Sequence, residues 1–245
     1  SSKIVIKQYK LVHELGPNEM DYWQNHRDQY AEVFAITYEA IKKACSDCIL
    51  YMPVPHISEL NQGQNFLSDV LGYLKGKNLP DIGFDYHTWS TDLSKPIFDN
   101  WKTRGEDYRT SVEYINRIKE LASKNGFSGS NIISGESGMA GTLEMESYQA
   151  GYVIRSYVTN LAYGQKKQLW TSVIEYSQYN DAIIFAHTGL IHNPANSDGL
   201  SHKKLAYYSY KKMVEVLEGS DWDNIQKVQE SGDVYIYKFT KSSKP

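Results

Sequence analysis

The feature that most constrains the fold is an alternation of short apolar runs with longer amphipathic stretches. Residues 48–54 form an apolar run that ends at Pro53 and Pro55, which is typical of a buried strand. Before it, Tyr30, Phe34 and Tyr38 recur at intervals of four, as on one face of a helix. Repeated strand-then-helix units predict a parallel sheet that is covered by helices.

The same pattern continues along the chain. The expected strands cover residues 9–15, 48–54, 81–88, 131–135, 168–176 and 233–239, and the expected helices cover residues 30–44, 66–74, 112–121, 145–161 and 205–217. No GxGxxG or GxxxxGK sequence opens any of these helices, which argues against an open nucleotide-binding sheet. Polar and acidic residues fall at strand ends, where a closed barrel carries its chemistry, although an open sheet does the same. The expected class is α/β, and the pattern mildly favours a closed (β/α)₈ barrel over an open sheet.

Composition excludes several kinds of partner. Of the 245 residues, 41% are hydrophobic and 22% are charged, as in an ordinary globular protein. The net charge of −3 provides no basic stripe, so we expect no nucleic-acid partner. No run of about 18 apolar residues exists, so we expect no membrane-spanning helix. There is no recognisable signal peptide, and the compartment stays unknown.

The two cysteines, Cys45 and Cys48, are spaced as CxxC but follow a predicted helix. A redox motif of this spacing begins a helix, where the helix dipole stabilises a thiolate. One CxxC also supplies only half of a four-ligand zinc site. We expect ordinary structural cysteines without a redox function, and a local disulfide or a metal contact remains as an alternative.

Residues 89–107 show no helical pattern and contain Trp89, Trp101 and Arg104. Connections of this length are usually functional or disordered. The aromatic side chains fit either a binding rim or packing over the mouth of a barrel, and the sequence leaves both readings open.

Two glutamates follow strand ends. Glu19 comes after Asn18 beyond the first expected strand, and Glu136 ends the fourth within Ser134-Gly135-Glu136-Ser137-Gly138. Cleavage of a glycosidic bond needs one carboxylic acid to protonate the leaving oxygen and one carboxylate to attack the anomeric carbon. Two carboxylates at one barrel mouth meet that need. By pattern alone, both residues also fit ordinary surface glutamates.

Several longer segments resemble the clan A glycoside hydrolases in the same order. The segments are Tyr9-Lys10-Leu11-Val12 with Asn18-Glu19-Met20-Asp21, then Phe84-Asp85-Tyr86-His87-Thr88-Trp89, Ile132 to Gly138, and Leu169-Trp170-Thr171-Ser172-Val173. They resemble the fourth, sixth, seventh and eighth barrel strands of that clan, and the nearest family is that of the β-xylosidases and α-L-iduronidases.

The resemblance implies a retaining hydrolase that needs neither a cofactor nor a metal. It implies Glu19 as the acid/base, with Glu14 as the fallback, and Glu136 as the nucleophile. The implied substrate-binding residues are Asn18 at the sugar 2-hydroxyl, His87 beside Glu136, Trp170 under the ring, and more weakly Tyr86, Trp89 and Glu175. Tyr86 is weaker because strand alternation points it away from the side that His87 faces.

The resemblance also implies an incomplete barrel. A full barrel typically takes about 250 residues for eight units, and this chain offers about five. We expect residues 1–220 to be the C-terminal part of the barrel and residues 221–245 to begin an accessory β-sandwich. A carbohydrate substrate is expected, together with either a homo-oligomer or a separate segment that supplies the first strands. The alternatives are a non-catalytic carbohydrate-binding or barrel fragment and an open-sheet enzyme of another class.

The histidines offer little sign of a metal site. His13-Glu14 begins an HExx string, but Pro17 excludes an HExxH metal helix. His187, His192 and His202 lie near Asp198 in the chain, and loop histidines of this kind are usually solvated or hydrogen-bonded. We therefore expect no metal.

Overall fold

The computed structural model describes residues 6–12, 22–23, 25–55, 65–90, 109–176, 184–195, 202–231 and 234–241, without the side chains of residues 89–90, 109–110 and 184–185. The chain divides into two compact units. Unit 1 comprises Ser1–His87 and Glu113–Gly135, and unit 2 comprises Thr88–Val112 and Glu136–Pro245. The division does not test the expected domain boundary at residue 220.

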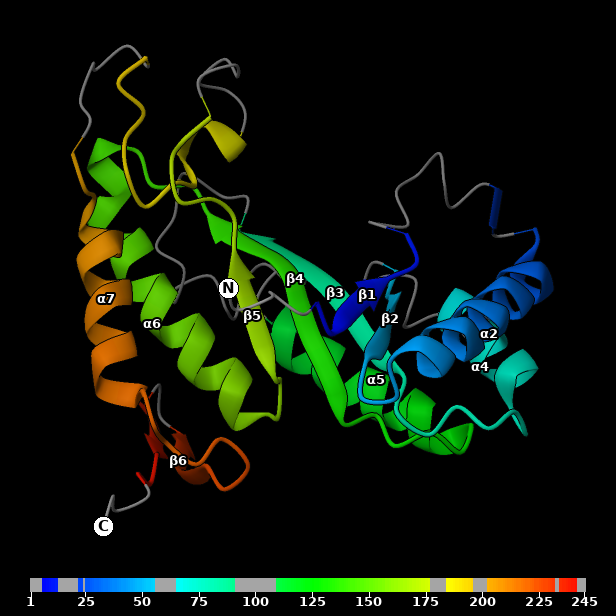
Figure 1. The fold of residues 1–245 in the computed structure, drawn as a ribbon. Coiled ribbons are helices and arrows are strands. Elements are labelled where there is room, and N and C mark those ends of the chain that lie inside the picture. Colours follow the sequence, from blue (N-terminus) through cyan, green and yellow to red (C-terminus); the bar gives the residue numbers. More distant parts are fainter. Residues whose placement is uncertain are drawn as a thin grey trace, which may run out of the picture. The chain divides into compact units, whose positions relative to one another are not determined.

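The strands of one sheet follow the chain order, β1-β2-β3-β4-β5, and run parallel (Figure 1). They are β1 (Gln8–Lys10), β2 (Ile49–Pro53), β3 (Gly83–Ser90), β4 (Asn131–Met139) and β5 (Lys167–Trp170). In unit 1, Tyr9 lies opposite Leu50, and Met52 lies opposite Phe84. Sequential parallel strands with helices between them confirm the expected α/β class, an incomplete (β/α)₈ barrel.

The core of unit 1 forms where helices α2 (Arg27–Ala44) and α4 (Phe66–Leu74) pack side by side (Figure 1). Tyr30 of α2 stacks on Phe34 at 6.3 Å between ring centroids and meets the ring of Phe66 edge-on at 5.1 Å. All three are fully buried, as the helical spacing predicted. Asn65 begins α4 by accepting a hydrogen bond from the Ser68 backbone N–H at 2.8 Å.

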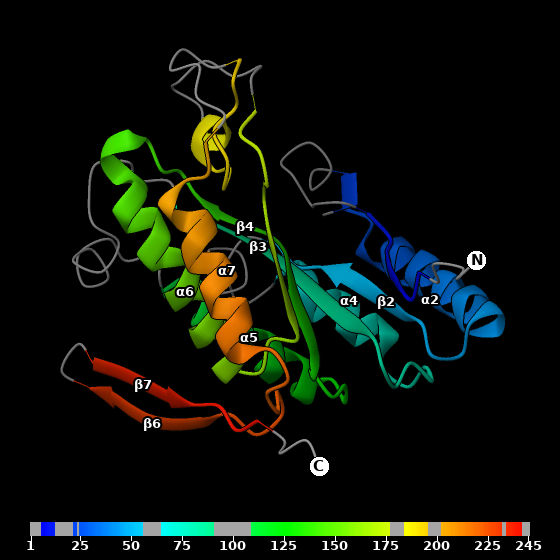
Figure 2. The same ribbon diagram turned by 60° about the vertical axis from the view of Figure 1, so that its left-hand side comes forward.

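In unit 2, helices α6 (Glu146–Ala162) and α7 (Leu205–Leu217) pack side by side (Figure 2). Tyr157 and Tyr210 meet edge-on across them, with ring centroids 5.4 Å apart. Buried amides join α6 to the strands. Gln149 donates to the Met139 carbonyl at 2.8 Å, and Asn160 donates to the side chain of Gln168 at 2.8 Å. These hydrogen bonds satisfy polar groups that would otherwise be costly to bury.

The remaining elements of the described residues are one long helix, two 3₁₀ turns and a hairpin near the C-terminus. They are α5 (Arg109–Lys124), the 3₁₀ turns η1 (Leu143–Met145) and η2 (Ile184–His187), and an antiparallel pair, β6 (Gln226–Ser231) and β7 (Val234–Lys238). The strand expected at 233–239 corresponds to β7. That this hairpin begins a β-sandwich stays a prediction. No helix within the described ranges combines the length and apolar character that crossing a bilayer requires.

Two expectations need correction. Cys45 and Cys48 form a disulfide, where we expected cysteines without a bond between them. The turn after α2 brings their Cα atoms to 5.4 Å, within disulfide range.

The last barrel strand was expected over 168–176, but β5 ends at Trp170. Beyond it, Ile174 forms only an isolated bridge with Ile191. Residues 171–176 were therefore wrongly assigned to the strand.

Candidate active site

A row of polar side chains occupies one face of the strands in unit 1. Successive strand residues point to opposite faces of a sheet. On β3, Tyr86 points toward helix α5 and stacks on Tyr114, with ring centroids 4.9 Å apart. Its neighbours Asp85 and His87 therefore point the other way, away from that helix.

Asp85 is the centre of this row. It is 2% exposed. Lys10 of β1 reaches it with Nζ 2.5 Å from Oδ2, and His87 Nε2 lies 3.8 Å from the same oxygen. Lys10 Nζ is also 3.1 Å from His87 Nε2. A lysine, an aspartate and a histidine thus share one site. Lys10 is the last residue of β1, at the carboxyl end where barrel enzymes place their chemistry, whereas Asp85 and His87 lie within β3.

The row reaches β4 through the backbone of Gly135. Its N–H donates to Asp85 Oδ1 at 2.6 Å. A Cβ atom on residue 135 would lie 2.5 Å from Asp85 Oδ2, so any residue other than glycine would force the buried Asp85 carboxylate to move. Asp85 therefore fixes the backbone at the residue that precedes Glu136.

The charges in this row affect two pKa values. Burial alone would raise the pKa of Asp85, but the neighbouring His87 and Lys10 outweigh burial and hold that pKa below its usual value. Burial, assisted by the negative charge of Asp85, raises the pKa of Tyr51 to about 12. Asp85 is accordingly ionised and Tyr51 neutral near pH 7.

Glu136 lies within β4, partly exposed between the buried Ser134 and Ser137. The strand was expected to end at Gly135, and it continues to Met139, so Glu136 is held on a regular strand rather than in a loop. The other predicted carboxylate, Glu19, lies outside the described residues, together with Asn18 and the fallback Glu14. The side chain of Trp89 also lies outside them. The separation of the two glutamates stays a prediction.

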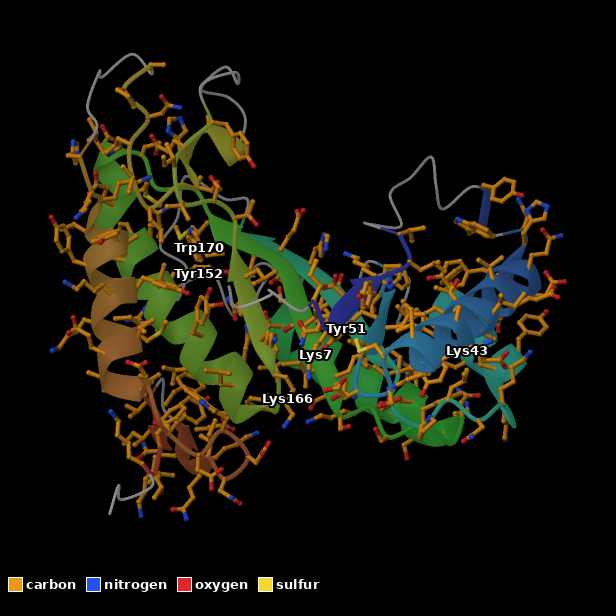
Figure 3. The ribbon with its side chains drawn as sticks, in the orientation of Figure 1. Lys7, Lys43, Tyr51, Tyr152, Lys166 and Trp170 are labelled. Carbon is orange, nitrogen blue, oxygen red and sulfur yellow. A yellow bond between two sulfur atoms is a disulfide. The ribbon has the colours of Figure 1, made fainter. Side chains whose placement is uncertain are left out.

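Trp170 ends β5 in unit 2 and faces Tyr152 of α6, with ring centroids 5.9 Å apart (Figure 3). Its indole N–H donates to the Thr188 carbonyl at 2.9 Å. These two contacts fix the ring plane while leaving the side chain partly exposed. A fixed, partly exposed indole is suited to stacking on a sugar ring, and that role stays a prediction.

Two of the weaker candidates are buried in structural contacts. Tyr86 is 0% exposed against α5. Glu175 is 2% exposed, and its Oε1 accepts a hydrogen bond from Lys204 Nζ at 2.8 Å. The burial of both side chains argues against direct contact with a substrate, and their contribution to substrate binding stays a prediction.

Glu175 belongs to a buried cluster near the N-terminal ends of α6 and α7. His192 lies between two carboxylates, with Nδ1 3.0 Å from Glu175 Oε2 and Nε2 2.9 Å from Glu146 Oε1. His202 Nε2 lies 3.8 Å from the same oxygen of Glu146. Burial alone would raise the pKa of Glu146, but hydrogen bonds from His192 and from the Leu205 backbone N–H outweigh burial and lower it.

Sequence reasoning did not predict the roles of Lys10, Asp85, Glu146 and Lys204. Asp85 and Lys10 both lie within the segments that resemble the barrel strands of clan A glycoside hydrolases. The alternation of Asp85 with the apolar Tyr86 along β3 could have placed Asp85 on the polar face. Glu146 matches the preference for an acid in the first turn of a helix, which concealed its contact with His192. Nothing in the pattern marks Lys204 as a fully buried lysine.

No family model matches the chain, and neither does any curated protein. Solved structures do. A family 39 glycoside hydrolase from Bacteroides cellulosilyticus WH2 matches with a TM-score of 0.60 at 17% identity, covering 88% of this chain and 42% of its own. The GH39 enzyme from Xanthomonas axonopodis pv. citri matches with a TM-score of 0.53 at 16% identity, covering 86% and 40%. A family 51 α-L-arabinofuranosidase from Bifidobacterium longum gives 0.51 at 12%, covering 76% and 40%.

At these identities the matches show the fold alone. The chain spans about two fifths of the length of each of these three proteins. The chain thus has the fold of part of an α/β barrel, and the solved structures that share this fold are clan A glycoside hydrolases. The resemblance to the β-xylosidase and α-L-iduronidase family stays a prediction.

Proposed function

We propose that this chain carries the catalytic carboxylates of a retaining glycoside hydrolase, with Glu136 as the nucleophile and Glu19 as the acid/base. The observation that favours this most is the way in which the backbone next to Glu136 is held in place. The residue is partly exposed on β4, and the preceding Gly135 is hydrogen-bonded to the buried Asp85. A nucleophile needs such a fixed backbone because small displacements cost large factors in rate.

The mechanism has two displacements. Glu19 donates its proton to the glycosidic oxygen while a Glu136 oxygen attacks the anomeric carbon, so the leaving alcohol departs and a glycosyl ester forms. Glu19, now ionised, takes a proton from water as that water attacks the same carbon and releases Glu136. Asn18 binds the 2-hydroxyl, His87 orients Glu136, and Trp170 stacks under the ring. The side chain of Trp89 belongs to the binding rim.

The test is the stereochemistry of the product, measured on the chain completed with the segment that supplies the remaining barrel strands. Proton NMR of the first-formed sugar should show retained configuration, because carboxyl groups about 5–5.5 Å apart leave no room for a water in the first step. An inverted product would contradict the mechanism.

Variants separate the two roles. Glu136→Ala should abolish turnover of all substrates. Glu19→Ala should slow the first displacement for substrates with poor leaving groups and largely spare that displacement for activated aryl glycosides, whose leaving groups need no protonation. The second displacement should slow for both kinds of substrate, because Glu19 also activates the attacking water. Glu144→Ala removes an exposed glutamate outside the site and should act like the parent chain. A Glu136→Ala variant with near-normal rates would exclude Glu136 as the nucleophile.

A second candidate function is carbohydrate binding without catalysis. The partly exposed indole of Trp170, held by Tyr152 and the Thr188 carbonyl, favours it, because such a ring can stack on a sugar without any catalytic group. It predicts saturable binding of oligosaccharides that Trp170→Ala weakens, with no release of sugar by the completed form.

A further inference from the structure

The cluster around His192 has the composition of a metal centre. Glu146, His192 and His202 each offer one ligand atom, and these atoms all lie within 4.8 Å of one another. The three residues come from separate parts of unit 2: the start of α6, the segment before residue 195, and the segment that leads into α7. Two histidines and one glutamate are a ligand set that zinc uses in proteins.

The distances fit an ion after a small adjustment. Ligand atoms about 2.1 Å from a tetrahedral zinc ion are about 3.4 Å apart. Glu146 Oε1 lies 2.9 Å from His192 Nε2 and 3.8 Å from His202 Nε2, on either side of that separation. All three atoms lie within 4.8 Å of one another, so changes of at most about 1.4 Å in any separation would place them in the first coordination sphere.

Supporting contacts orient two of the ligands. His192 Nδ1 lies 3.0 Å from Glu175 Oε2, and the other oxygen of Glu146 accepts a hydrogen bond from the Leu205 N–H at 3.1 Å. A carboxylate at Nδ1 keeps the proton there and leaves the Nε2 lone pair for the ion, as is usual around metal-binding histidines. Lys204 Nζ lies 2.8 Å from the second oxygen of Glu175, which fixes that carboxylate in turn.

We propose that Glu146, His192 and His202 bind one divalent transition-metal ion, and the donor set favours Zn²⁺. His192 is 3% exposed while His202 is 44% exposed, so the site is buried on one side and open on the other. The ion would join the N-terminal ends of α6 and α7. This site is separate from the proposed glycosidase chemistry, and its test does not depend on activity.

The test is direct binding to the full chain, without a polyhistidine tag, after removal of metal with a chelator. Calorimetric titration with Zn²⁺ should show one ion per chain. Co²⁺, used as a spectroscopic probe, should give the visible absorption bands of tetrahedral cobalt. Zinc at about one hundred times its Kd should raise the thermal midpoint by about 5–10 °C. Reductant is omitted, so that Cys45 and Cys48 stay bonded and do not compete for the metal.

Substitutions test which residues bind the metal ion. His202→Ala removes a half-exposed ligand with little effect on folding, and it should abolish one-to-one binding and the cobalt spectrum. Glu175→Gln keeps the shape but changes the support of His192, so affinity should fall about 10–100-fold. Glu144→Gln and His26→Gln lie outside the cluster and should bind like the parent chain. The absence of saturable binding, or full binding by His202→Ala, would overturn the proposal.

Discussion

At the scale of single residues, Asp85 determines the conformation of its surroundings in unit 1. It accepts from Lys10 and from the Gly135 N–H, and it occupies the space that a side chain at position 135 would need. A buried carboxylate is stable in the folded state only with partners of this kind. The glycine before Glu136 is therefore a packing requirement of Asp85, quite apart from any catalytic role.

Gly135→Ala should destabilise the chain by about 1–3 kcal/mol, because its Cβ would displace the Asp85 carboxylate and disturb the Lys10 ion pair. Urea unfolding would measure the change. Gly72→Ala is the matched control. Gly72 lies inside α4 with nothing within 4 Å of an added Cβ, so alanine there should add about 0.5–1 kcal/mol of stability. Equal stability of Gly135→Ala and the parent would disprove the packing argument.

The lowered pKa of Asp85 predicts how stability depends on acid. A carboxyl group whose folded pKa lies below its unfolded value, about 3.9, contributes stability at higher pH. It loses that contribution as the pH falls through the folded pKa. Asp85→Asn removes the contribution, so below about pH 4 its free energy of unfolding should fall less steeply than that of the parent.

Urea unfolding at pH 7, 5, 4, 3 and 2 measures these slopes, and Glu39→Gln, an exposed position on α2, serves as the control and should follow the parent. Parallel acid slopes for Asp85→Asn and the parent would show that Asp85 does not carry the effect.

At the scale of elements, the sequence predicted best where one face is buried. Phe66–Leu74 was placed at its observed bounds because Phe66 and every aliphatic residue of the helix pack inward, while Tyr73 is exposed. β6 was missed because its residues, Gln226–Ser231, are polar and exposed on both faces, so no period shows. The strand that corresponds to β5 was predicted too long, because the apolar residues Val173 and Ile174 suggested a buried strand. In the structure both side chains are exposed and lie beyond the end of β5.

The residues of the candidate site also differ in how well the sequence predicted them. The local pattern assigned Glu136 and His87 to β4 and β3, although both residues lie within these strands rather than at their ends. The partners of Asp85 and His192 come from distant segments, 75 residues away for Lys10 (85 − 10) and 46 for Glu146 (192 − 146). Sequence spacing carries no signal of such contacts, and Glu175 was kept as a sugar ligand for that reason.

The disulfide joins the end of α2 to the start of β2, and removing it tests both stability and function. Closing so short a loop contributes about 2 kcal/mol in the chain-entropy model. The double variant Cys45→Ser/Cys48→Ser should lose up to that amount in urea unfolding. Dithiothreitol should lower the parent to the same level and leave the variant unchanged. The glycosidase rate of the completed form should stay unaltered, and a large loss of turnover without unfolding would indicate a redox role.

At the scale of the whole molecule, the sheet that the described residues form has β1 and β5 as its terminal strands. An exposed parallel edge presents unpaired backbone N–H and C=O groups, which favour pairing with another strand. The structural matches are more than twice as long as this chain and share its fold over most of its length. Both facts favour further strands from elsewhere as the complement of this sheet.

We therefore expect this chain alone to associate. Sedimentation velocity from about 1 to 100 µM should show a weight-average mass that rises with concentration above 28.1 kDa. Addition of a polypeptide that supplies three more strand–helix units should give a discrete complex instead, because paired edges remove the driving force for self-association.

Hydrogen exchange of the backbone amides measures whether the edge strands of the sheet are paired. The amides of β1 should be poorly protected in the isolated chain and should gain protection in the complex, while those of β3, an interior strand, should change little. A stable monomer across the whole range, with β1 already as protected as β3, would show that the chain completes its own sheet.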